Sequence, residues 1–343
     1  MPAARVTVVI PTYDGWELLR TMLPSVLAQT FADLRVVVVD DGSTDGTPEK
    51  LAAAFPAVDV VGHERNRGVT AAFRTGTDAV DGELFLLLNN DVELTPGYVA
   101  HLVVELDRHP EAACAVGKLR RYAERERIDA AGDAVLPSGA ALNRGAGAID
   151  RGQYDAGEEV FSACGGAVLY RMAAFRDVGG FDADFVAYLE DVDWSFRARL
   201  RGWTVRYVPQ ALAFHVGHAT SAQRRAHHAT LQRRNHLLVV LKNYPGPTLL
   251  RFGALVLAYQ AAWFLGSVRD GLAGAHLRAW ADVVRALPAT LRKRRAVQAA
   301  RRAEPTEIER LLRAGLPPGG PVVRLALQLA PELTARRLAG AER

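Results

Sequence analysis

Acidic side chains follow two apolar runs of this 343-residue chain, at the points where strands would end. Asp40 and Asp41 come directly after the run 35–39, and Asp91 comes shortly after the run 84–88. Asp-Gly and Asn-Asp pairs are ordinary turn residues, so either motif alone also fits a simple turn. The carboxyl ends of parallel strands, however, meet at one edge of an open α/β sheet, where ligands bind. Two strand ends that both carry carboxylates therefore favour a ligand site.

A third acidic group consists of Glu190, Asp191 and Asp193, at the start of a helix predicted over 190–201. One explanation is local, because the helix dipole stabilises acidic residues in a first turn. Three carboxylates within four residues also repel one another, so one of them should have a raised pKa or lie beside a cation. A carboxylate in such a setting can act as a general base.

The sequence lacks the common phosphate-binding loops. It contains no GxxxxGK[ST] motif, and the glycines after the first apolar run do not form GxGxxG. A pocket for a nucleoside diphosphate would then need a metal ion held by carboxylates. Mg²⁺ suits that role because it takes oxygen ligands and shares phosphate oxygens, and Asp91 is placed to supply one ligand.

The elements that must position these residues follow from the alternation of apolar runs and helical patterns in the first 120 residues. Continuous apolar runs indicate strands that are buried on both faces, which is typical of a mostly parallel sheet flanked by helices, an α/β fold. Strands are predicted over 6–10, 35–39, 58–61, 84–88 and 113–116, and helices over 16–29, 48–55, 69–80 and 96–109.

The segment 120–160 is charged, glycine-rich and without clear periodicity, and we predict an insertion or mobile loop there. Ordered structure is predicted again over 161–170, after this insertion or loop. After the helix at 190–201, a strand is predicted over 204–208, and a histidine-containing segment, 213–218, ends this part of the chain.

The charge is divided unevenly along the chain, whose formal net charge is +4. Residues 1–220 hold 21 basic and 31 acidic groups, whereas residues 221–343 hold 21 basic and 7 acidic groups. A balance of −10 in one part and +14 in the other points to a basic segment that meets an anionic surface, either nucleic acid or membrane.

Composition excludes several classes of protein. An apolar content of 49% excludes a disordered chain. Two cysteines, Cys114 and Cys164, exclude a disulfide framework and favour a reducing compartment. The first residues carry no long apolar run before a cleavage site, so we expect no secretory signal.

The sequence pattern of the basic part, residues 221–343, predicts helices. Its most apolar stretch, 249–268, is marginal for a membrane-spanning helix, which needs about 20 apolar residues. Basic clusters beside an apolar stretch fit an element that lies on an anionic membrane. The alternative is a helical cap whose arginines face water. Nucleic acid is disfavoured because the aromatic residues lie in the apolar stretch and not among the arginines.

Seven blocks of sequence, in order, resemble inverting family 2 glycosyltransferases of the GT-A fold, closest to bacterial rhamnosyltransferase-like enzymes of cell-surface polysaccharide synthesis. The resemblance covers roughly residues 5–220, and seven ordered blocks are far more specific than any one of them. The blocks are VTVVIPTYDGWELL, VVVVDDGSTDGT, ERNRGVTAAFRTG, LFLLLNNDVEL, GGAVLYRMAAFRDVGGFDADF, LEDVDWSFRARLRGW and AFHVGHATS.

The resemblance assigns roles to individual residues. Donor-nucleotide binding is implied for Pro11, Thr12, Tyr13, Asp40, Asp41, Asn66, Gly68, Arg74, Asn89 and Asn90. Asn89-Asn90-Asp91 stands where the family has its DxD motif, with Asn89 in place of the first acid, which leaves Asp91 as the implied metal ligand. Glu190 and Asp191 match the ED motif, whose Asp is the catalytic base. His215 resembles the histidine that completes the metal site, and His218 is the competing candidate.

The resemblance implies transfer of a sugar from a nucleotide sugar, with inversion and with Mg²⁺ or Mn²⁺ as cofactor. Rhamnose from dTDP-rhamnose is the expected donor, and a glycan or a polyprenyl-diphosphate-linked acceptor is the expected partner at an anionic membrane. We therefore expect a cytoplasmic enzyme, peripheral on the inner face of the cell membrane, that takes part in cell-envelope glycan synthesis and has no nucleic-acid partner.

Three alternatives remain from the sequence. The first is a UDP-sugar transferase that uses galactofuranose or a hexose, and the second is a catalytically silent nucleotide-sugar-binding scaffold. A nucleotidyltransferase is disfavoured because Pro11-Thr12-Tyr13 is not a basic, glycine-rich loop. The expected organisation is a GT-A catalytic domain over 1–220 with an acceptor loop at 120–160, a membrane-associating segment over 221–303 and a tail over 304–343.

Overall fold

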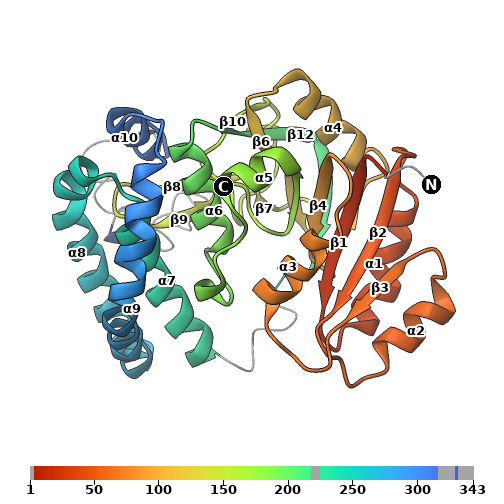
Figure 1. The fold of residues 1–343 in the computed structure, drawn as a ribbon, viewed down its shortest axis with the longest axis horizontal. Coiled ribbons are helices and arrows are strands. Elements are labelled where there is room, and N and C mark those ends of the chain that lie inside the picture. The colour runs from red at the N-terminus through yellow and green to blue at the C-terminus, as the bar shows by residue number, and fades with distance from the viewer. Residues whose placement is uncertain (1–3, 218–224, 316–328, 331–343) are drawn as a thin grey trace.

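A computed structural model describes residues 4–217, 225–315 and 329–330 (Figure 1). Strands and helices alternate first and helices alone follow. The first part contains β1 Val6–Thr12, α1 Trp16–Leu27, β2 Leu34–Asp40, α2 Thr47–Ala54, β3 Asp59–Gly62, α3 Val69–Asp78, β4 Leu84–Leu88, β5 Val92–Leu94, α4 Tyr98–Arg108 and β6 Ala112–Arg121. The second contains β7 Ile128–Ala130, β8 Asp133–Val135, β9 Ala141–Asn143, β10 Glu158–Glu159, β11 Ala167–Arg171, α5 Met172–Val178, a 3₁₀ turn η1 Ala183–Phe185, α6 Glu190–Leu200, β12 Thr204–His215, α7 Arg225–Asn243, α8 Gly246–Arg269, α9 Ala273–Ala299 and α10 Pro305–Ala314.

Ten of the described strands form one mixed sheet. Its main path runs β10-β12-β6-β11-β4-β1-β2-β3. Strands β3, β2, β1 and β4 are parallel to one another, and β12 is parallel to β6. Strand β11 lies between β4 and β6 and is antiparallel to both. The sheet is therefore mixed and mostly parallel, as predicted.

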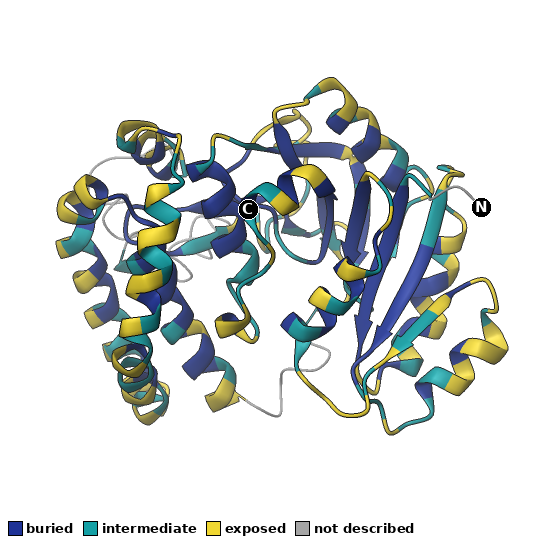
Figure 2. Ribbon diagram, viewed as in Figure 1, coloured by how far each residue is buried: buried dark blue, intermediate teal, exposed yellow. Residues whose placement is uncertain are grey.

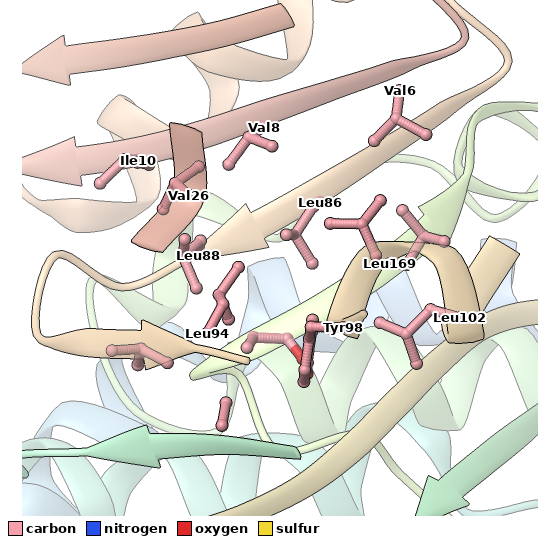
Figure 3. Packing of buried hydrophobic residues seen from close by; sticks show 14 of the residues in the cluster. Val6, Val8, Ile10, Val26, Leu86, Leu88, Leu94, Tyr98, Leu102 and Leu169 are labelled. Carbon is pink, nitrogen blue, oxygen red and sulfur yellow. The ribbon is translucent and has the colours of Figure 1, made fainter. Parts of the chain in front are cut away.

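The core lies on both faces of the central strands, which are the darkest elements in Figure 2. Every residue of β4 is buried, which explains why this strand is a continuous apolar run. Figure 3 shows residues of one face, where Leu86, Leu88 and Leu169 pack near Tyr98 of α4. The buried Tyr98 hydroxyl donates to the Ala167 carbonyl at 2.7 Å, so its polar end is satisfied.

The segment 120–160 differs from the predicted mobile loop. It contains β7, β8 and β9, with β8 and β9 forming a two-stranded hairpin, and residues 130–140 are buried. Small residues at 130–134 leave little apolar side chain from which a strand pattern could be recognised. Gly132 and Gly139 turn the chain with positive φ. This segment is thus part of the folded body next to β6 and β11.

Helices α7 to α10 pack together at the end of the molecule opposite β3 (Figure 1). They share one apolar cluster with α6, formed by residues such as Phe196, Leu200, Leu238 and Tyr244. The backbone N–H groups of Arg302 and Ala303 donate to the carbonyl of Leu200, the last residue of α6. The predicted boundary at 220 and most of the predicted tail lie outside the described residues.

Candidate active site

The carboxyl ends of β1, β2 and β4 meet at one edge of the sheet, as the sequence predicts. The N–H of Asp41 donates to the carbonyl of Thr12 at 2.8 Å, and Nδ2 of Asn90 donates to the Thr12 hydroxyl at 3.0 Å. A methyl group on Gly15 would collide with the Thr12 hydroxyl at 2.2 Å. Three of the residues implied in nucleotide binding therefore lie side by side, in the crevice where open α/β sheets bind ligands.

The Asp41 carboxylate is buried and contacts residues of the loop 63–68. Oδ1 contacts a ring nitrogen of His63 at 2.7 Å and accepts from the N–H of Arg67 at 2.9 Å. Oδ2 accepts from the N–H of Gly68 at 2.8 Å. Asp41 thus shapes the loop 63–68 that leads into α3. These three contacts fix the loop, and since a carboxylate can accept about four hydrogen bonds, the nucleotide-binding role of Asp41 stays a prediction.

Asp40 differs from Asp41 because only one of its carboxylate oxygens has a hydrogen-bond partner within the described residues. Oδ2 accepts from the N–H of Ser43 at 3.0 Å, whereas Oδ1 is buried without a hydrogen-bond partner among the described residues. A buried acceptor that lacks a partner is costly, so this oxygen is suited to receive an N–H or O–H from a ligand.

The other residues implied in nucleotide binding differ in their exposure and contacts. Tyr13 and Arg74 are exposed. Asn66 is also exposed, and its Oδ1 accepts from the Gly68 N–H at 3.2 Å. Gly68 precedes α3 with φ 88°, a conformation that favours glycine. Pro11 is buried within β1.

Asp91, His215 and Asp129 form a chain of polar contacts beyond the end of β4. Nε2 of His215 lies 3.4 Å from Oδ1 of Asp91, and its Nδ1 lies 2.8 Å from Oδ2 of Asp129. Oδ2 of Asp91 accepts from the Gly217 N–H at 3.2 Å. Burial lowers the pKa of His215, but the hydrogen bonds to both carboxylates outweigh it and raise that pKa to about 10. The charged imidazole therefore balances the two acids, and coordination of a metal ion by Nε2 would require the loss of its proton.

The donor set fits a divalent cation. Carboxylate oxygen and imidazole nitrogen are ligands of Mn²⁺, and Mg²⁺ prefers oxygen. Among the described residues, no three His, Cys, Asp or Glu side chains are arranged to enclose an ion on their own. Asp91 and His215 would leave coordination positions for phosphate oxygens and water, which is how Mg²⁺ binds at phosphate sites. The competing candidate, His218, lies outside the described residues.

Asp191 faces the same edge of the sheet from the first turn of α6. Its Oδ2 accepts from the N–H of Gly165 at 2.8 Å, and Oδ1 accepts from the N–H of Val192 at 2.8 Å. The next glycine, Gly166, accepts at its carbonyl from the N–H of Asn89 at 2.9 Å. Two consecutive glycines thus connect the Asn89–Asp91 segment to the Asp191 carboxylate.

The environment of Glu190 and Asp191 favours their protonated forms. Burial raises the pKa of Glu190, and the charge of Asp191 raises it further. Burial also raises the pKa of Asp191, and the hydrogen bonds from Val192 and Gly165 oppose that shift. Oε2 of Glu190 is buried without a partner among the described residues. A carboxylate with a raised pKa is a stronger base, which suits general-base catalysis.

Asp193 differs from its two neighbours because it has cationic partners. Oδ1 lies 2.7 Å from Nζ of Lys242, and Oδ2 accepts from Nε of Arg197 at 3.0 Å. The adjacent Trp194 is fully buried, packs edge-on against Tyr170 and donates its N–H to a backbone carbonyl. These contacts fix α6 on the sheet, so Asp193 and Trp194 have structural roles.

The chain enters α6 through backbone conformations that side chains rarely adopt. Val186, Tyr188 and Leu189 have φ values of 58°, 68° and 62°, and none is glycine. Each such residue costs roughly 1–3 kcal/mol and is common at functional sites. The two carboxylates 190 and 191 follow directly.

Several residues near the site were missed in the sequence, notably Asp129, Asp133 and Gly165. The first two belong to the segment predicted to be a loop, which carries no strand pattern. Asp133 is buried, and burial together with the charge of Asp191 raises its pKa well above the usual range. Gly165-Gly166 is a visible signal, since paired glycines before an apolar strand indicate close backbone approach.

Comparison with known proteins supplies a family. A model described as "Glycosyl transferase family 2" matches residues 7–179. An N-acetylglucosaminyl-diphospho-decaprenol L-rhamnosyltransferase of Mycobacterium tuberculosis is 30% identical over 256 residues, which covers 68% of this chain and 83% of that protein. A pre-mycofactocin glycosyltransferase of the same species is 30% identical over 276 residues, with 78% and 53% covered.

Solved structures share the fold at low sequence identity. GalNAc-T7 with UDP, GalNAc and Mn²⁺ has a TM-score of 0.57 at 17% identity and covers 76% of this chain, which spans about half of that protein. The mannosyltransferase PcManGT from Pyrobaculum calidifontis with GDP-Man and Mn²⁺ has a TM-score of 0.52 at 20% identity, with 95% and 86% covered. These likenesses establish the sheet and its flanking helices as a common architecture.

Proposed function

Because the chain belongs to glycosyl transferase family 2 and has the GT-A fold, it is a nucleotide-sugar-dependent inverting glycosyltransferase, and we propose that it transfers rhamnose from dTDP-rhamnose. The acceptor is a hydroxyl of a polyprenyl-diphosphate-linked or polysaccharide glycan. The similarity to the mycobacterial rhamnosyltransferase, over most of that protein, supports both the donor and the lipid-linked acceptor.

One observation carries the proposed mechanism: the Asp191 carboxylate is held by the Gly165 N–H beside the Asn89–Asp91 segment. Asp191 takes the proton of the acceptor hydroxyl while that oxygen forms its bond to the anomeric carbon. The bond from this carbon to the diphosphate oxygen breaks in the same step, and its electron pair leaves with the nucleoside diphosphate. Attack from the face opposite the leaving group inverts the anomeric centre.

The leaving group is held at the edge formed by β1, β2 and β4. Asp91 and His215 would hold Mg²⁺ or Mn²⁺, which when bound offsets the charge that develops on the departing diphosphate. Oδ1 of Asp40, which has no partner among the described residues, accepts a hydrogen bond from the nucleotide. The exposed side chains of Tyr13 and Arg74 contact the nucleotide. Gly68 allows the backbone of the 63–68 loop to approach the ligand.

A donor screen tests the function. Purified protein with Mg²⁺ or Mn²⁺ is given dTDP-rhamnose, UDP-galactofuranose or UDP-hexoses with a lipid-linked acceptor, and nucleoside diphosphate release and glycan product are measured. We expect turnover with dTDP-rhamnose. Asp191→Asn should abolish transfer while donor affinity changes less than about twofold, because the amide cannot take a proton. Turnover only with a UDP-sugar would overturn the donor assignment, and substantial turnover by Asp191→Asn would overturn the base.

We also propose that α8 and α9 lie on the inner face of the cell membrane. Helix α8 is the one described helix that is long and apolar enough to cross a membrane by length and composition, and three of its five leucines are exposed. Leu250, Leu257 and Leu265 are 89%, 70% and 68% exposed, with Arg251 and Arg269 exposed near the two ends of the helix. An exposed apolar face with arginines at its ends fits a helix in the plane of an anionic surface.

Helix α9 repeats this pattern at intervals of seven residues. Its exposed apolar residues are each followed by an exposed arginine, in the pairs Leu277-Arg278, Val284-Arg285 and Leu291-Arg292. Each cation contributes about 1 kcal/mol near an anionic leaflet. Flotation with anionic and neutral vesicles tests this placement. We expect binding to anionic vesicles only, weakened by salt and by Leu257→Glu/Leu265→Glu, whereas Leu27→Glu on α1 binds normally. Equal binding to both vesicles would contradict the electrostatic part.

A further inference from the structure

Asn235 of α7 is fully buried and contacts the segment that leads into α6. Its side-chain Nδ2 donates to three backbone carbonyls, those of Phe185 at 2.9 Å, Ala187 at 2.8 Å and Tyr188 at 2.7 Å. The amide has two hydrogens, so the three carbonyls share them. Few side chains could serve three acceptors from one position.

Two of these carbonyls, those of Ala187 and Tyr188, need a side-chain donor because the backbone after the 3₁₀ turn η1 is neither helix nor strand. The Phe185 carbonyl, at the end of η1, also accepts from the Ala187 N–H at 2.5 Å. Residues Val186, Tyr188 and Leu189 have positive φ, and this conformation turns their peptide groups away from regular partners. Buried backbone carbonyls must nevertheless be paired. Asn235 donates to three of the four carbonyls of the segment 185–188, and the helix with Glu190 and Asp191 begins two residues after Tyr188.

On its other side, the segment 185–189 contacts α3, which follows the predicted nucleotide-binding loop 63–68. The hydroxyl of Thr70, in the first turn of α3, donates to the Val186 carbonyl at 2.8 Å. Gly68 lies next to the Val186 side chain, since a methyl group on Gly68 would be 3.8 Å from it. The segment 185–189 thus lies between α3 on one side and α7 on the other.

Ion pairs fix the same region to α7 and α9. Asp182 lies 2.6 Å from Nζ of Lys242 and 2.5 Å from Nζ of Lys293, and Lys242 also pairs with Asp193 at 2.7 Å. The chain contains four lysines among its 42 basic residues, and two of them meet at Asp182. The buried ammonium of Lys242 therefore connects the residues before and after the 185–189 segment.

We propose that Asn235 is a positioning residue for the reaction: it holds the segment 185–189 so that Asp191 meets Gly165 at the acceptor hydroxyl. This proposal rests on the proposed function, in which Asp191 is the base. Asn235 contacts neither substrate nor cofactor, and it acts through the backbone that precedes α6. The C-terminal helices then contribute to catalysis as well as to the fold.

Three variants test the proposal. Asn235→Ala removes both donors, Asn235→Ser retains one, and Thr230→Val is the matched control, because Thr230 is buried in α7 and donates to backbone carbonyls of α7 and of the first turn of α9. We expect kcat to fall about 10- to 100-fold in Asn235→Ala, the cost of displacing a catalytic group by around 1 Å, with Asn235→Ser between it and the wild type. Donor Kd should stay within about twofold, and Thr230→Val should keep the wild-type kcat.

Amide hydrogen exchange gives a second readout that a general loss of stability would not reproduce. Exchange at residues 185–192 should increase in Asn235→Ala and not in Thr230→Val, at matched fractions of folded protein. If Asn235→Ala does not fold, the same comparison is made with Asn235→Ser. The proposal is wrong if the Asn235 variants lose no more kcat than Thr230→Val, or if exchange rises equally throughout α7.

The outcome for Asp191→Asn separates this proposal from the proposed function. An inactive Asp191→Asn with an unaffected Asn235→Ala refutes the positioning role alone. An active Asp191→Asn refutes the base assignment. If Asn235→Ala then still lowers kcat, Asn235 positions a group other than Asp191, and the proposal as stated is wrong.

Discussion

Gly165 is the position where a single added carbon should move the proposed base. A methyl group on Gly165 would lie 2.9 Å from Oδ2 of Asp191 and 3.5 Å from its Cγ, whereas ordinary contact begins at 3.4 Å. The carboxylate must therefore shift by about 0.5 Å, because the methyl is fixed to the backbone and Asp191 is bound to Val192 on its other side. Since a misplacement of around 1 Å costs roughly 100-fold in rate, Gly165→Ala should lower kcat about tenfold.

The same substitution should change the pH profile. The hydrogen bond from the Gly165 N–H lowers the Asp191 pKa against the effect of burial. Lengthening this bond raises the pKa, and a base must be deprotonated to act. The acidic limb of kcat/KM should therefore move to higher pH in Gly165→Ala.

Gly166→Ala is the matched control for this experiment. Its methyl group would meet a side-chain carbon of Leu119 at 3.2 Å and no atom of Asp191, and neither glycine has a positive φ. Steady-state kinetics with saturating donor, donor Kd and Tm are measured for both variants. The reasoning is refuted if Gly165→Ala keeps the wild-type kcat and pH profile, or if Gly166→Ala loses as much activity at equal Tm.

Three further predictions concern stability and the metal. Asp193→Ala removes the buried carboxylate of Arg197 and one of the two carboxylate partners of Lys242, which keeps Asp182. It should lower the free energy of unfolding by about 2–3 kcal/mol in urea titrations; a loss below about 1 kcal/mol would contradict the ion-pair network. Burial lowers the pKa of His236 to about 4 from 6.5, so the unfolded chain binds its proton first as the pH falls. Stability should drop by up to about 3 kcal/mol between pH 6.5 and 4, and His236→Gln should flatten that slope. A chelator should abolish transfer, added Mn²⁺ or Mg²⁺ should restore it, and Asp91→Asn should require more metal for half-maximal activity; transfer unaffected by chelation would exclude the metal role.

The order of strands and helices up to β6 could be predicted because buried parallel strands produce continuous apolar runs. The runs that became β1, β2 and β4 also placed Asp40, Asp41 and Asp91 at strand ends, and the structure brings these ends together. Their hydrogen bonds were not predictable. Asp41 contacts the 63–68 loop, whereas one oxygen of Asp40 has no partner in the described part of the chain, and this difference depends on tertiary contacts that leave no local pattern.

The segment around 120–160 and the support of α6 could not be predicted for physical reasons. Strands β7 and β8 are short and contain small residues, so their burial comes from neighbouring elements and not from their own apolar pattern. Strand β11 runs antiparallel between β4 and β6, an order that its sequence does not encode. The contact of Asn235 with the carbonyls before Glu190 joins residues about 50 positions apart, and nothing local in either segment indicates it.

Helix α6 is held at both ends by the C-terminal part of the chain: Asn235 of α7 supports the segment before it, and the backbone N–H groups of Arg302 and Ala303, between α9 and α10, donate to its last residue, Leu200. This arrangement limits how enzymes of this type can be recombined. A chimera that joins the sheet of one relative to the terminal helices of another would separate the base from the residues shaped to support it. Exchanges meant to change the acceptor should therefore transfer α6 together with α7 to α10, with the crossover placed before Asp182.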